Sequence, residues 1–251
     1  MHADVIEWGA FYASPTGRAS RMLLARAIAR LWPDVPAPGQ RMMGLGYALP
    51  YLDSWRAGPA ERVLAFMPAG QGVTAWPQGS MGNRGNAACL VDENQLPLAD
   101  ASVDRILAIH ALEGAAQPQA MLQECWRVLS GQGSLLLVVT NRHGLWARAE
   151  QLPFGHGSPY SLHQAMHALQ DALLIPRQTC HALHAPPALI ASSFWEELGA
   201  RVIPALAGMI LIEASKQTWV PARRVGLPAR QRLPLVPATL PHSCSGRDGA
   251  A

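Results

Sequence analysis

The feature that most constrains the fold is a pair of unbroken apolar runs separated by a helical pattern. Residues 104–110 contain the run Ile106-Leu107-Ala108-Ile109, and residues 135–139 form a second run of strand length. Strands this uniformly apolar are covered on both faces, as in a parallel sheet. Between them Pro118 suits a first helical turn, and apolar residues recur at helical spacing as far as Leu129. The order strand, helix, strand predicts a crossover unit and therefore a parallel sheet.

Similar patterns continue on both sides of this unit. Helices are expected from Ser14 to just before Pro33 and after a capping box that begins at Ser161. Gly131 and Gly133 are expected to end the helix that begins at Pro118. Glycine and proline residues exclude regular structure from residues 68–87. Apolar runs predict strands that start at residue 41 and cover residues 62–66, 88–91 and 208–214, with a short helix at 194–198.

Polar and glycine motifs follow the ends of these predicted strands. Gly44-Leu45-Gly46-Tyr47 follows the first strand, Asp92-Glu93 follows the third, and His110-Ala111-Leu112-Glu113 follows the fourth. Arg127-Val128-Leu129-Ser130-Gly131 then closes the next helical pattern. A glycine turn between strand and helix lets the backbone approach a ligand closely.

The motifs of residues 92–140, with their spacing, resemble the nucleotide-binding core of class I S-adenosylmethionine (SAM) methyltransferases, especially the small-molecule type 11 group. The resemblance extends over about residues 40–215. It implies an α/β, Rossmann-like fold with a mostly parallel seven-stranded sheet, flanking helices and an antiparallel last strand. It also implies that the histidine- and glycine-rich loop of residues 153–160 covers a substrate.

The resemblance further implies a SAM site at the carboxyl ends of the strands. Asp92 would face the adenine edge, and His110 would lie beside the methionine portion. The chain departs from the family pattern at three places: Met42 replaces an acid, Ala48 replaces the third glycine, and Met67-Pro68-Ala69 stands where an acid would bind the ribose. The implied cofactor residues are Gly44, Gly46, Tyr47, Asp92, Glu93, Ile109 and His110.

Each of these motifs also has a purely structural interpretation. The glycine turn could be a tight connection, Asp92 could cap a turn, and His110 could be a hydrogen-bonded histidine at a strand end. Arg142, His156 and Tyr160 could bind a substrate anion or act as a general base, but their spacing assigns no catalytic role to any of them. Methyl transfer can proceed largely by positioning, so a missing catalytic group decides nothing.

Two functions therefore remain open. The first is a SAM-dependent methyltransferase acting on an unidentified substrate. The alternative is a methyltransferase-like protein without catalysis that acts as a binding or regulatory partner, because both acidic cofactor anchors are replaced. A nicotinamide oxidoreductase fits less well, since Leu49 occupies the third glycine position of that motif.

Charge and composition bound the domain organisation and the partners. We expect one methyltransferase-like domain over residues 1–215, with an N-terminal helical segment (1–39) and a Rossmann-like core (40–215). Residues 216–251 carry six basic residues, one acid and five prolines, which predicts a disordered basic tail. The rest of the chain has 14 basic and 16 acidic residues, so we do not expect nucleic-acid binding.

Cysteine, histidine and leader patterns suggest a cytoplasmic protein without a metal. The four cysteines are far apart and form no C-x-x-C pair, which favours reduced thiols. The pairs His163/His167 and His181/His184 lack the acid of a zinc motif, and we predict no metal site. The amino end has acids where a signal peptide needs positive charge, and no apolar run is long enough to span a membrane.

Overall fold

The computed structural model describes residues 3–77, 85–190, 192–202 and 204–217. Residues 1–218 form one compact unit, and a second unit of residues 219–251 lies outside the described residues. The predicted disordered tail therefore falls almost wholly outside them, although Lys216 is the last residue of a strand. The domain boundaries remain predictions.

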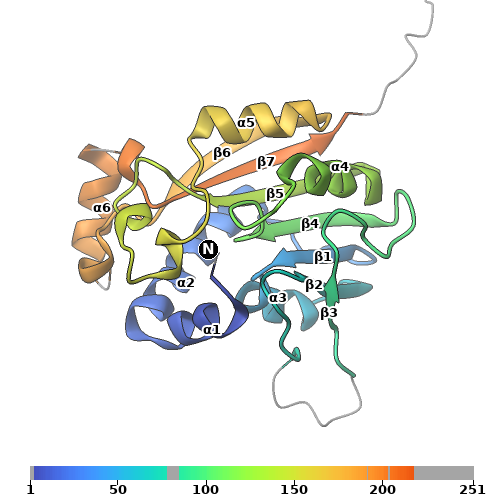
Figure 1. The fold of residues 1–251 in the computed structure, drawn as a ribbon, viewed down its shortest axis with the longest axis horizontal. Helices are drawn as coiled ribbons and strands as arrows, with labels where there is room; N and C mark the ends of the chain where they lie inside the picture. The colour runs from blue at the N-terminus through green and yellow to red at the C-terminus, as the bar shows by residue number, and fades with distance from the viewer. Residues whose placement is uncertain (1–2, 78–84, 191, 203, 218–251) are drawn as a thin grey trace, which may run out of the picture. The chain divides into compact units, whose positions relative to one another are not determined.

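The compact unit is built on one seven-stranded sheet with the order β3-β2-β1-β4-β5-β7-β6 (Figure 1). Neighbouring strands from β3 to β5 are parallel, whereas β7 is antiparallel to both β5 and β6. This confirms the predicted fold class. The strands are β1 (Arg41–Gly46), β2 (Arg62–Pro68), β3 (Ala88–Val91), β4 (Val103–Ile109), β5 (Leu129–Thr140), β6 (Leu174–Ala182) and β7 (Met209–Lys216).

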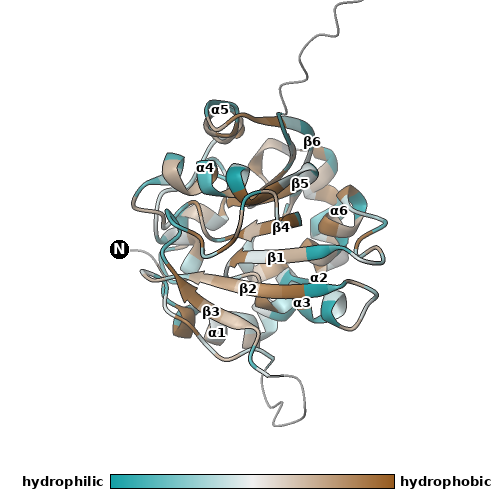
Figure 2. Cartoon of the chain, turned by 90° about the vertical axis from the view of Figure 1, so that its right-hand side faces the viewer, coloured by the Kyte–Doolittle hydropathy of each residue, from teal (hydrophilic) through white to brown (hydrophobic). Residues whose placement is uncertain are grey.

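Helices cover both faces of the sheet because its central strands are apolar on both sides. In β4, Leu107 and Ile109 belong to one buried cluster, while Ile106 and Ala108 belong to the other. Figure 2 shows the hydrophobic residues concentrated on the strands, with hydrophilic stretches mainly on helices and loops. The first cluster includes residues of α1 (Val5–Ala13), α2 (Pro15–Leu31) and α3 (Leu49–Arg56), and the second includes residues of α4 (Pro118–Val128) and α5 (Leu162–Asp171).

Shorter elements complete the unit. The segment after β5 contains η1 (Trp146–Arg148) and η2 (Pro153–Gly155), and the segment before β7 contains η3 (Pro187–Leu189), α6 (Ser193–Val202) and η4 (Pro204–Leu206). Residues 69–77 and 85–87 contain neither helix nor strand, as predicted for the described part of residues 68–87. Within the described ranges, no helix is both long and apolar enough to cross a membrane.

Several sequence predictions need correction. The helix α4 ends at Val128, and the strand β5 begins at Leu129, so Gly131 and Gly133 lie in a strand and do not end the helix. The pairing of β5 with β4 shifts register across these residues, from Val103 opposite Leu129 to Arg105 opposite Ser134. The helix predicted at 194–198 covers Ser193–Val202, and β7 lies next to the edge strand β6.

Candidate functional site

The candidate site lies where the parallel strands end. The sheet order changes direction between β1 and β4, and open α/β sheets bind ligands beyond the carboxyl ends of strands at such a switch point. Pro68 of β2, Glu93 after β3, His110 after β4 and Thr140 of β5 all line one small cavity at this edge. The topology thus brings together four segments that are far apart in the sequence.

The glycine turn after β1 is held by the protein's own backbone. Gly46 has a φ of 78°, and a Cβ atom there would overlap the Ile109 carbonyl oxygen and lie 2.8 Å from the Cβ of Ala111. The Tyr47 N–H donates to the same Ile109 carbonyl at 3.0 Å. A Cβ at Gly44 would lie 2.5 Å from Leu52 Cδ1. Close packing of β1 against β4 and α3 therefore already requires both glycines.

Helix α1 covers this edge of the sheet with aromatic side chains. It begins with a capping box in which Asp4 accepts hydrogen bonds from the first turn and Glu7 bonds back to the Asp4 N–H. Trp8, Phe11 and Tyr12 follow at i, i+3 and i+4 spacing and are all buried. An uncharged aromatic face of this kind is driven out of water and onto the strand ends.

Trp8 and Tyr12 both contact His110. The Trp8 and His110 rings are stacked with their centroids 3.7 Å apart and an interplanar angle of 16°. The Tyr12 hydroxyl lies 2.9 Å from His110 Nε2. Phe154 of η2 packs edge-on against both Trp8 and His110, with centroids 5.2 Å from each. The imidazole is therefore enclosed by aromatic rings from two distant segments.

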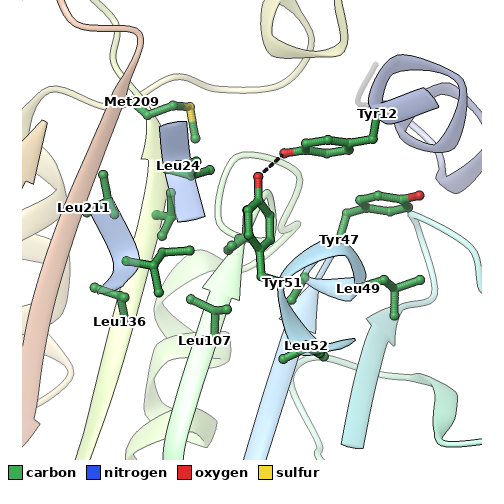
Figure 3. Packing of buried hydrophobic residues seen from close by; sticks show 14 of the residues in the cluster. Tyr12, Leu24, Tyr47, Leu49, Tyr51, Leu52, Leu107, Leu136, Met209 and Leu211 are labelled. Atoms are coloured by element: carbon green, nitrogen blue, oxygen red, sulfur yellow. Dashed lines mark hydrogen bonds between the residues drawn. The ribbon is translucent and has the colours of Figure 1, made fainter. Parts of the chain in front are cut away.

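A chain of hydroxyl groups defines the state of the His110 ring. The Tyr51 hydroxyl donates to the Tyr12 hydroxyl at 3.1 Å, the bond drawn in Figure 3. Tyr12 then has its own proton to donate to His110 Nε2, and in the other tautomer that proton would have no acceptor among the described residues. The imidazole proton is thus assigned to Nδ1. Burial lowers the pKa of His110 to about 3, so the ring is neutral at physiological pH.

Burial also raises the pKa of the tyrosines and of one carboxyl at this site. The pKa of Tyr12 is raised by burial and by its neighbour Tyr51, whose own pKa is raised by burial. The pKa of Glu113 is raised by burial against the opposing effect of hydrogen bonds from Thr140. These groups resist ionisation because a charge would lose its hydration there.

The cavity left beneath α1 is small and is lined by both polar and apolar groups. Its volume is about 30 Å³, which is room for one or two water-sized groups. Gln71 and His110 are both 5% exposed, and Gln71 Oε1 and His110 Nδ1 have no hydrogen-bond partner among the described residues. Glu113 Oε2 is likewise unpartnered within the described ranges. The residues that line the cavity are Ala3, Trp8, Pro68, Gly70, Gln71, Glu93, His110, Ala111, Glu113, Gly114, Thr140, Pro153 and His156.

Only two of the seven predicted cofactor residues line the cavity. Glu93 and His110 line the cavity. Ile109 is fully buried, and only its backbone takes part, as the acceptor for Tyr47. Asp92 is exposed and accepts a hydrogen bond from the Asn94 N–H at 2.9 Å, which is a turn-capping role. Gly44, Gly46 and Tyr47 are buried beside the cavity and do not line it.

Of the other candidate residues, His156 lines the cavity, and the Tyr160 N–H donates to the carbonyl of the lining residue Thr140 at 3.0 Å. His156 Nδ1 lies 3.6 Å from Glu7 Oε2 of α1. Arg142 is exposed and donates to the Pro159 carbonyl at 3.3 Å. His167 pairs with Asp171 and His184 with Glu196. Within the described ranges, no three His, Cys, Asp or Glu side chains are grouped so that they could hold a metal ion.

Sequence reasoning missed three residues of the site: Trp8, Tyr12 and Gln71. The first two carried a signal, because aromatic residues at helical spacing follow an Asp-x-x-Glu capping box. Gln71 carried none, since it lies in an irregular segment. Its role is visible only in three dimensions, where its side-chain amide N–H donates to the His110 backbone carbonyl at 3.2 Å and its backbone carbonyl accepts from the Val5 N–H at 2.8 Å.

Comparisons with known proteins give one family match and many matching folds. A family model described as a methyltransferase domain matches residues 44–137. A search of curated proteins gave no significant match. Residues 44–137 include the glycine turn and end within β5, so the match contains Pro68, Glu93 and His110 of the cavity lining but not Thr140.

Solved structures with low sequence identity share the fold. A SAM-dependent methyltransferase of Thermotoga maritima, described as a possible histamine N-methyltransferase, is 15% identical with a TM-score of 0.59 over 85% of this chain and 96% of that one. A complex from Haloferax volcanii of the methyltransferase activator Trm112 with a proposed methyltransferase matches at 17% identity and a TM-score of 0.61, over 84% of this chain and 98% of that one. The [4+2]-cyclase SpnF matches at 15% identity and a TM-score of 0.53, over 78% of this chain and 81% of that one. At these identities the likeness concerns the fold alone.

Proposed function

The chain has the class I methyltransferase fold, with residues 44–137 matching a methyltransferase domain, and from this premise we propose that it is a SAM-dependent methyltransferase. The observation that carries the proposal is the cavity at the switch point between β1 and β4, where this sheet order places a ligand. We propose that its partner is an unidentified methyl acceptor or a protein, and that it acts in the cytoplasm. The acceptor itself is unidentified.

The residues present fit SAM in their chemistry but not in the space they leave. Gln71 Oε1 and His110 Nδ1 are buried and unpartnered among the described residues, so they could bond to polar groups of a cofactor. A cavity of about 30 Å³ is far below the roughly 300 Å³ at which small-molecule sites begin. The aromatic side chains of α1 occupy the missing space. SAM binding therefore requires α1 to move away from the strand ends.

We propose that the cofactor site consists of the seven residues predicted from the sequence together with Gln71. When bound, SAM supplies an electrophilic methyl group. The protein's own contribution would be to bind and orient: Glu93 and His110 line the cavity, and the turn at Gly46 positions Tyr47 beside them.

The requirement for opening sets the expected affinity. A ligand that binds only an open form has its apparent affinity reduced by the fraction of protein in that form. Closure by α1 buries Trp8, Phe11 and Tyr12, so the open form is a minor one. We therefore expect SAM to bind more weakly than it would to a preformed pocket.

A second candidate function is a methyltransferase-like binding protein without catalysis. The protein's own aromatic rings fill the edge of the sheet, and Pro68 and Met42 stand where acids are expected, which favours this alternative. The likeness to SpnF is consistent with it, because a cyclase with this fold illustrates that the fold does not fix the reaction. The complex containing Trm112 illustrates a protein partner for such a fold.

Calorimetric titration with SAM and S-adenosylhomocysteine distinguishes the two functions. Saturable binding that is weakened in Asp92→Ala would support the proposed cofactor site, including its adenine end. Binding retained in Asp92→Ala would limit Asp92 to the turn-capping role that its bond to Asn94 indicates. No heat with ligand at about 1 mM would mean a binding free energy weaker than about −4 kcal/mol and would favour the binding protein.

A further inference from the structure

Exposed apolar side chains are concentrated in the segment before β7. Among the described residues twelve large hydrophobic side chains are exposed, and six of them lie between residues 189 and 206. Single exposed apolar residues are normal on a protein surface, whereas a contiguous group marks an interaction site. The six residues are Leu189, Phe194, Trp195, Leu198, Val202 and Leu206.

The helix α6 is attached to the protein through a different side from the one that carries these residues. Glu196 Oε1 lies 3.1 Å from His184 Nδ1, and a Cβ atom at Gly199 would lie 2.8 Å from the His184 carbonyl oxygen. Residues four apart follow one another along one side of a helix, and the residues at i, i+4 and i+8 from Phe194 are exposed. The exposed side, here called the α6 stripe, consists of Phe194, Leu198 and Val202, with Trp195 beside them.

One acid and one base border the α6 stripe on the same side. Glu197 and Arg201 are both exposed, and neither forms an ion pair or a side-chain hydrogen bond among the described residues. At about 100° per residue, both lie next to Phe194 on the helix surface. A partner that neutralises both must present a base and an acid in the reverse order. A surface of one charge sign, such as an anionic membrane, can neutralise only one of them.

A second copy of α6 that runs antiparallel presents this arrangement. In a two-fold symmetric contact, residue i of one copy meets residue j of the other, and residue j meets residue i. With Leu198 at the two-fold axis, Phe194 faces Val202 of the second copy. The same placement brings Glu197 close to Arg201 of the second copy, as charged borders pair between packed helices. Both charges are therefore neutralised, and each pair forms twice.

We propose that the protein forms a two-fold symmetric dimer through antiparallel packing of the α6 stripe. At roughly 200 Å² for a large side chain, the six exposed residues present on the order of 500 Å² of apolar surface. Two copies would bury about twice that area, and a polar rim would bring the total to the low end of specific interfaces, about 1,200 Å² or more. The dimer should therefore be weak. It does not rest on the proposed function and uses none of the residues assigned to the cofactor.

Sedimentation equilibrium of the full-length protein tests the dimer. Between about 1 and 200 µM the average mass should rise from one chain toward two, with a dissociation constant in the micromolar range. Leu198→Glu places two like charges at the two-fold axis and should weaken association at least about thirtyfold. Met22→Glu changes an exposed apolar residue of α2 and should leave association unchanged. The mass of one chain at every concentration, growth beyond two chains, or equal effects of the two variants would overturn the proposal.

Charge reversal tests the antiparallel arrangement. Glu197→Arg and Arg201→Glu each bring like charges together in a dimer of that variant, and each variant alone should associate about fivefold or more weakly than wild type. In an equimolar mixture of the two variants, opposite charges meet again at both places. The mixture should therefore associate about as tightly as wild type. A mixture that associates no more tightly than the separate variants would overturn the proposal.

Discussion

Replacing Trp8 with alanine should release α1 from the sheet without unfolding the sheet itself. Trp8 is 5% exposed and stacks on His110 with centroids 3.7 Å apart. Apart from neighbours in its own helix, its ring contacts are with Tyr47, His110 and Phe154. These are the contacts that join the face of α1 to the strand ends.

The expected magnitude follows from the burial of the side chain. Truncating a buried tryptophan to alanine costs about 3–5 kcal/mol. Because α1 lies at the amino end and is not part of the sheet, this loss should fall on the opening of α1. At about 1.4 kcal/mol per power of ten, the open population should rise by about two to three and a half powers of ten.

Hydrogen exchange measured by peptide mass spectrometry tests this directly. In Trp8→Ala, amides of α1 should exchange at least about a hundredfold faster, whereas those of β4 should change little. Trp195→Ala is a matched control, because Trp195 is 42% exposed in α6. A similar loss of protection in α1 and β4 would refute the reasoning, since α1 would then unfold only together with the sheet.

Three further changes test single contacts. In wild type the free energy of unfolding should fall as the pH drops from 6.5 toward about 3, because folded His110 stays neutral while the unfolded chain binds a proton. The fall should be steeper than in His110→Asn by about 1.4 kcal/mol per pH unit. Equal slopes for the two proteins in denaturant titrations would contradict this. Gly46→Ala should lower the free energy of unfolding by about 1–3 kcal/mol more than Gly39→Ala, because both residues have a positive φ but only Gly46 lacks room for a Cβ. Equal shifts of the melting temperature in the two variants would refute this expectation. Tyr12→Phe should lower the free energy of unfolding by about 1–3 kcal/mol, because it leaves His110 Nε2 and the Tyr51 hydroxyl without their partner. Tyr160→Phe is the control, since the Tyr160 hydroxyl makes no hydrogen bond among the described residues. Equal urea midpoints for the two variants would refute this account.

The sequence predicted the centre of the sheet well because its physical cause is local. Strands buried on both faces must be uniformly apolar, and the central strands β4 and β5 contain apolar runs of that kind. The edge strand β6 was missed because seven of its nine residues are exposed or partly exposed and Pro176 interrupts it. Gly131 and Gly133 were misread because a glycine in a register shift and a glycine at a helix end look alike in sequence.

The candidate site was predicted in part, for a different reason. The motifs located the strand ends and identified Glu93 and His110, which do line the cavity. The side chains that cover it come from α1, and Tyr12 contacts a residue 98 positions away, a distance that no local pattern encodes. The motif reading also could not show that the Gly46 turn packs against the Ile109 carbonyl, because that contact depends on the neighbouring strand.

Calorimetric titration of wild type and Trp8→Ala with SAM, side by side, tests the central claim most directly. If α1 covers a cofactor site, removing the Trp8 ring raises the open population, and SAM should bind Trp8→Ala at least about tenfold more tightly than wild type. Weaker binding in the variant would mean that Trp8 supports the ligand directly. Absence of binding in both proteins with ligand at about 1 mM would contradict the claim that this edge of the sheet is a SAM site.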